Sequence, residues 1–141
     1  MAHAANEAIN RIISKQQPIK ISEVALGEYF RILVDKEFKE DPEALLSHAL
    51  FKIKQRTTIS ICVLPIEKLS RFISLIGHIK SKNQRIDFTD VIILACSLAD
   101  EECRCLLTFD QELIQNKDIN DVVKKETKDR KGFLITDRSP I

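Results

Sequence analysis

The sequence has little glycine, proline or aromatic residue. Its 141 residues include three glycines, four prolines, one tyrosine and no tryptophan. So few glycines and prolines leave no room for a long flexible linker. No apolar run reaches the roughly 20 residues of a membrane-spanning helix, and the N-terminus lacks the basic, apolar and small-residue pattern of a secretory signal. The sequence therefore predicts a single cytoplasmic domain over residues 1–141 with no membrane partner.

Basic and acidic residues nearly balance, so the net charge by itself predicts no partner. Lysine and arginine number 22, aspartate and glutamate 21, and the net charge is +1. A nucleic acid would therefore have to be bound through a local basic patch. With 44% apolar and 30% charged residues, the composition is that of an ordinary globular chain, long enough to bury one core.

Four cysteines, Cys62, Cys96, Cys103 and Cys105, are present, and three of them lie inside apolar runs. Cys103 and Cys105 flank one residue of an expected strand. This spacing is too tight for an easy disulfide and lacks the second half of a zinc site. We expect buried free thiols rather than a metal or redox centre.

Apolar periodicity predicts alternating helices and strands. Helices are expected over residues 4–14, 23–36, 42–53, 66–79, 89–99 and 120–125, with a short one near Asp110 and a polar loop over 80–85. Strands are expected over residues 19–22, 57–65, 104–109 and 132–136. Such alternation predicts an α/β fold in three layers, with a mostly parallel sheet flanked by helices.

Three aspartates stand at the ends of apolar elements between Ile86 and Leu113. Asp87 and Asp90 open an apolar helix, and Asp110 follows an apolar strand. Taken singly, each has a local explanation: Thr89 as the helix N-cap, Asp87 and Asp90 at the positive end of the helix dipole, and Asp110 starting a short helix. Taken together, they favour a shared site, because ligands gather at the carboxyl ends of parallel strands. The helix from Asp90 follows another helix, so topology alone does not require this meeting.

The segment DVIILACSLADEECRCLLTFDQEL resembles the C-terminal signature of PIN-domain proteins. Asp90 matches the aspartate that opens the helix, Ala95 its small residue, and Thr108 and Asp110 the pair that ends the next strand. Upstream, ISEVALGEYFRIL is similar to the second strand and following helix, which places the family's glutamate at Glu28. TTISICVLPIEKL and GFLIT are similar to the next and last strands, so the resemblance runs from about Ile19 onward.

The resemblance implies a nuclease that depends on Mg²⁺ or Mn²⁺ and acts on RNA, in RNA processing or as the toxin of a toxin–antitoxin pair. Asp90, Asp110 and Glu28 would then be metal ligands or organise water on the ion, and Thr108 would orient a carboxylate or a water. Hard divalent cations are held by such carboxylates together with substrate phosphate. The alternative is a catalytically inactive PIN-like module that binds RNA or an antitoxin-like protein. A third class, a phosphate- or small-molecule-binding domain, lacks a glycine-rich loop here.

The first strand of the family and its aspartate have no counterpart. The first aspartate, Asp35, falls in an expected helix. The strand is then either encoded upstream of this chain, supplied by another chain or by a rearranged sheet, or lost in a degenerate domain. An exposed sheet edge favours association, so we expect a homo-oligomer.

Two basic segments offer phosphate contacts. One contains Lys80, Lys82 and Arg85, and the other contains Lys124, Lys125, Lys128, Arg130 and Lys131. The alternative for both is a solvated loop. Neither segment has an aromatic side chain on which bases could stack, so base-specific recognition of a single strand is not expected.

Overall fold

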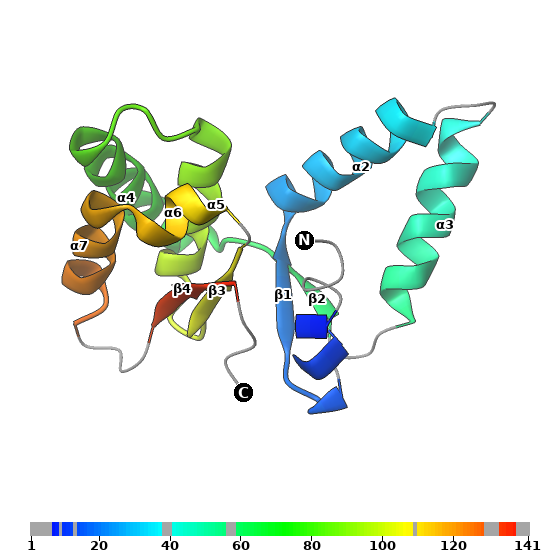
Figure 1. Cartoon of the computed structure of the whole chain (residues 1–141), viewed down its shortest axis with the longest axis horizontal. Coiled ribbons are helices and arrows are strands. Elements are labelled where there is room, and N and C mark those ends of the chain that lie inside the picture. The colour runs from blue at the N-terminus through cyan, green and yellow to red at the C-terminus, as the bar shows by residue number, and fades with distance from the viewer. Residues whose placement is uncertain are drawn as a thin grey trace. The chain divides into compact units, whose positions relative to one another are not determined.

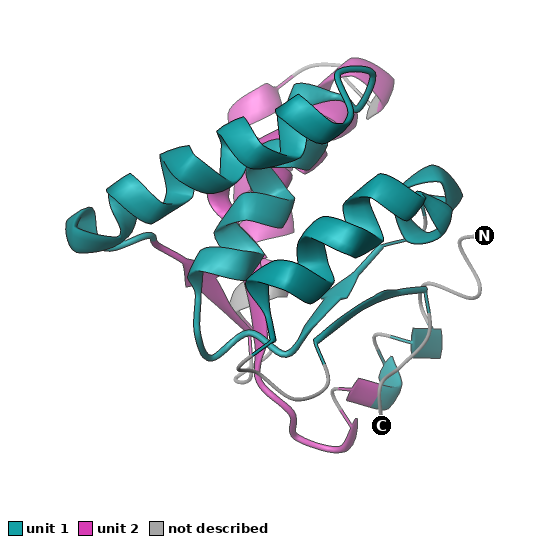
Figure 2. Ribbon diagram, turned by 90° about the vertical axis from the view of Figure 1, so that its left-hand side faces the viewer, with its two compact units in different colours: residues 1–11, 64–141 teal, residues 12–63 magenta. Residues whose placement is uncertain are grey.

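The structure is a computed structural model that describes residues 7–8, 10–12, 14–37, 41–55, 59–108, 110–128 and 133–137. The chain divides into two compact units, shown in different colours in Figure 2. Unit 1 comprises Met1–Arg11 and Leu64–Ile141, and unit 2 comprises Ile12–Val63. The expectation of one domain over 1–141 stays a prediction.

Unit 2 is a pair of parallel strands joined through two helices (Figure 1). Its elements are β1 (Ile19–Ser22), α2 (Glu23–Glu37), α3 (Pro42–Lys54) and β2 (Ile59–Cys62). β1 pairs in parallel with β2, from Ile19 opposite Ile59 to Ser22 opposite Cys62. Both helix starts are capped as the sequence predicts: Ala25 N donates to Ser22 Oγ at 3.0 Å, and Ala44 N donates to Asp41 Oδ1 at 3.2 Å.

Unit 1 holds the remaining elements and the main core. They are η1 (Ile66–Lys68), α4 (Leu69–Lys82), α5 (Phe88–Ala99), β3 (Cys105–Leu107), α6 (Gln111–Gln115), α7 (Lys117–Glu126) and β4 (Leu134–Thr136). β3 pairs in parallel with β4, with Cys105 opposite Leu134 and Leu107 opposite Thr136. The fold class is therefore mixed α/β, mostly helical, with short parallel strand pairs.

The core of unit 1 is built around α5, as the apolar sequence of this helix predicts. α4 packs against both α5 and α7. The buried core residues are Leu75, Ile79, Val91, Leu94, Ala95, Leu98, Ala99, Leu113, Ile119, Val122, Val123 and Ile135. At the rim, Glu126 of α7 ties this helix to α4, because it accepts from Arg71 Nη1 at 3.3 Å and contacts His78 Nδ1 at 3.0 Å. No helix in the described ranges is long and apolar enough to cross a membrane.

The N-terminal helix and the strands agree with the sequence in position. Residues 7–8, 10–12 and 14 are helical, inside the expected helix 4–14. β1 has its expected bounds, whereas β2, β3 and β4 are shorter than expected. Residues 57–58, Phe109 and Gly132 lie outside the described residues.

Three local expectations are wrong. α4 continues to Lys82, so the loop before α5 begins at Asn83 rather than at Lys80. α7 begins at Lys117, where Asn116 caps it, and not at Asn120. The helical spacing of Leu69, Phe72, Ile73, Ile76 and Ile79 predicts one apolar face that includes Ile73, but Ile73 is 61% exposed and Leu75 is 2% exposed. Residues 72, 75, 76 and 79 share the face that α5 and α7 cover.

Replacing Gly77 by alanine is expected to stabilise the protein. A Cβ at this position of α4 meets no atom within 4 Å, and Gly77 is exposed. Glycine within a helix is less stable than alanine by about 0.5–1 kcal/mol, because it loses more backbone freedom on folding. Urea denaturation followed by circular dichroism should show Gly77→Ala more stable by about this amount. A less stable variant would mean that this side of α4 is covered.

Candidate functional site

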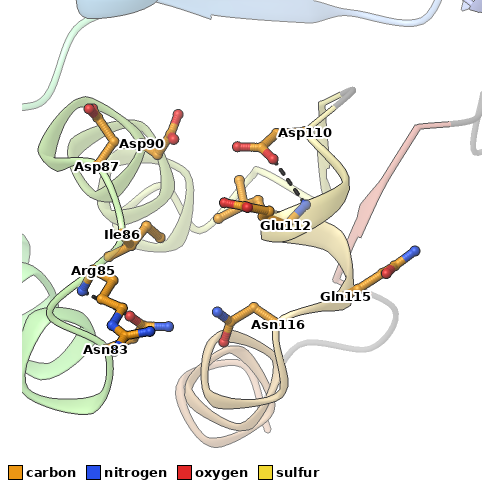
Figure 3. A pocket seen from close by; sticks show the side chains of 10 residues that line it. Asn83, Arg85, Ile86, Asp87, Asp90, Asp110, Glu112, Gln115 and Asn116 are labelled. Atoms are coloured by element: carbon orange, nitrogen blue, oxygen red, sulfur yellow. Dashed lines mark hydrogen bonds between the residues drawn. The ribbon is translucent and has the colours of Figure 1, made fainter.

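Unit 1 contains a pocket of about 600 Å³ next to the start of α5. Its lining comes from the α4–α5 loop, the first turn of α5, the N-cap residue Asp110 of α6 and the region around α6 (Figure 3). Four carboxylates line it, those of Asp87, Asp90, Asp110 and Glu112, together with the cation of Arg85. The structure thus brings Asp90 and Asp110 to one pocket, as the sequence predicted.

The short connection between α5 and β3 explains why these two aspartates meet. Only residues 100–104 separate the helix from the strand, and Asp100 tightens this turn by accepting from Cys103 N at 3.0 Å. β3 packs against α5 and must run back along it. The start of α5 and the end of β3 therefore lie at the same edge of unit 1.

Asp87 and Asp110 are both helix caps. Asp87 Oδ1 accepts from Thr89 N at 2.8 Å, and Asp110 Oδ1 accepts from Glu112 N at 3.0 Å. The expectation that Thr89 caps α5 is therefore wrong: the capping residue is Asp87. Among the described residues, neither carboxylate has a further hydrogen bond, so each keeps its second oxygen available in the pocket.

The pocket affects the protonation of Asp90. Burial raises its pKa above the ordinary value of an aspartate, and repulsion by Asp110 and then Asp87 raises it further. The surroundings of Asp90 therefore disfavour its charged form. A bound cation or a proton would relieve this cost.

Thr108 positions Asp110 through the backbone rather than through its carboxylate. Thr108 Oγ1 accepts from Asp110 N at 3.2 Å, and Thr108 N donates to Thr136 O at 2.9 Å. The threonine therefore ties the end of β3 to β4 and fixes the turn that carries Asp110.

Glu28 lies on α2 of unit 2. Its carboxylate accepts from Arg31 Nη2 at 2.8 Å, and this interaction raises the pKa of Arg31. A role for Glu28 as a third metal ligand stays a prediction.

The three basic residues near the pocket have different surroundings. Lys80 Nζ donates to the carbonyl oxygens of Gln84 at 3.0 Å and Ile86 at 2.8 Å, so this side chain holds the α4–α5 loop in place. Lys82 is exposed in the last turn of α4, and Arg85 lines the pocket. In the second basic segment, Lys124 and Lys125 end α7. Arg130 and Lys131 lie outside the described residues.

The four cysteines form no disulfide, as expected, but each is half-buried rather than buried. Burial, with a smaller contribution from Cys103, raises the pKa of Cys105 to about 11. Since the thiolate is the reactive form, Cys105 should react with iodoacetamide at neutral pH far more slowly in the folded than in the urea-unfolded protein. Peptide mass spectrometry over time would measure both rates. Equal rates would contradict the buried position of this thiol.

Binding of Mg²⁺ or Mn²⁺ by these carboxylates stays a prediction. In the described part of the chain, no group of three or more His, Cys, Asp or Glu side chains is arranged to hold a metal ion. Mg²⁺ commonly keeps several waters and binds through one or two carboxylates plus substrate phosphate. Asp90 and Asp110 supply such a pair of oxygen donors.

Sequence reasoning missed Glu112, Asn83 and Asn116 as residues of the pocket. Asn116 carried a readable signal, since an asparagine before a helix start is a preferred N-cap.

No known protein family, curated protein or solved structure matches the chain.

Proposed function

We propose that this chain is a PIN-like domain of the divalent-metal-dependent endoribonuclease type. The observation that supports this most is the convergence of Asp90 and Asp110 on one pocket, where burial and mutual repulsion raise the pKa of Asp90. The proposal includes a PIN-like fold in three layers for the whole chain, with the first strand of that family missing. It also includes a cytoplasmic location.

In this proposal Asp90 and Asp110 hold the cation, and Glu28 completes the set. A bound Mg²⁺ or Mn²⁺ would activate water for in-line attack on an RNA phosphodiester and neutralise charge on its oxygens. Thr108 is a positioning residue, because it fixes the turn at Asp110. Asp87 starts α5 and adds negative charge beside Asp90.

A catalytically inactive PIN-like module that binds RNA or a protein partner is the second candidate. It is favoured by the capping hydrogen bonds that already engage Asp87 and Asp110. A homo-oligomer or an antitoxin-like partner belongs to either proposal. Light scattering would test the first, and a clean monomer would count against it.

Incubation with RNA in Mg²⁺, in Mn²⁺ and in EDTA tests the leading proposal. We expect internal cleavage with either ion, its loss in EDTA, and its return when the ion is added in excess. Substrates labelled at the 5′ or the 3′ end distinguish internal cuts from trimming. RNA binding without cleavage in every condition would support the inactive module instead.

A further inference from the structure

The pocket has two ends of different chemistry (Figure 3). Asp90 and Asp110 lie at one end, and Asn83, Arg85 and Asn116 lie at the other. The acidic end belongs to the site already described. At the second end, Asn83, Arg85 and Asn116 present hydrogen-bond donors, because of how these three side chains are held.

Hydrogen bonds fix the orientation of both asparagine amides. Asn83 Oδ1 accepts from Arg85 N at 3.0 Å, and Asn116 Oδ1 accepts from Ile119 N at 3.1 Å. Only the oxygen of an amide can accept from N–H, so each NH₂ group is directed away from these bonds. Neither NH₂ group donates to another described residue. Each asparagine therefore has both N–H donors of its amide available to a ligand, while its oxygen already accepts one hydrogen bond.

Arg85 carries a positive charge in a pocket with four carboxylates, but it pairs with none of them. Within the described ranges, its guanidinium has no ion pair and no hydrogen bond, and the side chain is exposed. A guanidinium offers five donors in a planar fork that matches the oxygens of a phosphate. Asn116 caps the ten-residue helix α7, so the positive end of this helix adds to the same field.

We propose that Asn83, Arg85 and Asn116 bind a backbone phosphate of an RNA strand, next to the phosphate that a cation held by Asp90 and Asp110 would contact. This inference rests on the proposed function and extends it to how the substrate is held. A cluster of donors that includes the cation of Arg85 favours an anionic acceptor, and the adjoining acids favour a ligand that brings a cation with it. A phosphodiester chain with bound Mg²⁺ meets both conditions. Such contacts bind phosphate oxygens and leave bases unread, so binding is expected to be independent of sequence.

Fluorescence anisotropy with a short labelled single-stranded RNA of mixed sequence tests the proposal. Arg85→Gln removes the charge and is expected to weaken binding by about 10-fold or more. It should also lower the slope of log affinity against log salt by about 0.7, because one phosphate contact is lost. Arg104→Gln is the matched control: Arg104 is exposed in the same unit, does not line the pocket, and should change affinity less than twofold, or about 0.4 kcal/mol.

Asn116→Asp provides a second variant that keeps α7 folded. Aspartate caps a helix as well as asparagine does, but it replaces the NH₂ donor with a negative oxygen. We expect affinity for RNA to fall by about 10-fold or more, with an unchanged circular dichroism spectrum. The titrations are made in Mg²⁺ and repeated in EDTA, with gels that confirm intact RNA.

Several results would overturn the proposal. These are unchanged affinity in both variants, an unchanged salt slope in Arg85→Gln, and no binding of RNA by the wild-type chain. If a mononucleotide binds as tightly as the RNA, the ligand of this site is a small phosphate ester and not an RNA strand.

Comparison with cleavage separates this inference from the proposed function. Binding that depends on Arg85, with no cleavage by the wild type, supports the phosphate site and overturns the endoribonuclease. Cleavage that depends on Asp90, with unchanged RNA affinity in Arg85→Gln and Asn116→Asp, supports the endoribonuclease and overturns the phosphate site.

Discussion

Replacing Asp90 by asparagine is expected to abolish metal-dependent RNA cleavage while leaving the fold intact. Asparagine has nearly the same shape but no charge, and Asp90 has no hydrogen bond to another described residue that the change would break. Losing a partner outside the ligand shell costs 10–100-fold in metal affinity or activity, so losing a direct ligand should cost more than about 100-fold. Initial cleavage rates over a range of Mg²⁺ concentrations would measure this loss.

The same substitution should make the protein without metal slightly more stable. Because burial, Asp110 and Asp87 raise the pKa of Asp90, its ionisation costs the folded state free energy. This cost is absent at low pH, where Asp90 is protonated in both states. It develops as the pH rises from about 4, the usual aspartate value, through the raised pKa of the native group. At neutral pH, Asp90→Asn should therefore melt at a slightly higher temperature than the wild type.

Bound metal should reverse that order. An ion at 100 times its Kd stabilises the folded state by about 2.7 kcal/mol, so Mg²⁺ should raise the melting temperature of the wild type. Asp90→Asn should lose most of this increase. An equal Mg²⁺ effect on both proteins would show that Asp90 holds no cation.

Asp110→Asn and Asp121→Asn complete the comparison. Asparagine can still cap α6 in place of Asp110, so any loss of cleavage reports the missing charge and not a lost helix. Asp121 is exposed on α7 and does not line the pocket, so Asp121→Asn should cleave like the wild type. Full cleavage by Asp90→Asn and Asp110→Asn would point to a contaminating nuclease.

Truncating Ile79 to alanine is expected to be among the most destabilising changes in α4. Ile79 is fully buried between the helices of unit 1. Replacing a buried isoleucine by alanine costs about 2–5 kcal/mol, because apolar contacts are lost and a cavity remains. Urea denaturation followed by circular dichroism would measure the loss.

Ile73 provides the control on the same helix. It is 61% exposed, so Ile73→Ala should change the free energy of unfolding by less than about 0.5 kcal/mol. The pair is informative because the apolar spacing of α4 places both isoleucines on one expected face. Equal losses in the two variants would contradict the buried face of α4 found here.

Local signals in the sequence account for the parts of the fold that were predicted well. Ser22 and Asp41 cap helices through hydrogen bonds to residues three positions ahead, so the residues that define each helix start are adjacent in sequence. The helix α5 was recognisable because it is apolar on nearly every side, and five of its residues are core residues. The register and length of the strands were harder to predict, since strands of three or four residues are defined by their hydrogen bonds to a partner strand.

The sequence of this protein by itself determined the order of the helices, the caps Ser22 and Asp41, the buried α5 and the candidate pair Asp90 and Asp110. The tertiary structure decided which face of α4 is buried. The apolar residues of α4 span a wider part of its surface than α5 and α7 cover, so some of them stay exposed. It also decided that Asp90 meets Asp110, since β3 turns back along α5. Finally, it placed Asn83, Arg85 and Asn116 around one pocket. Asn116 lies more than 30 residues beyond Arg85 in the sequence, and no local pattern encodes such a contact.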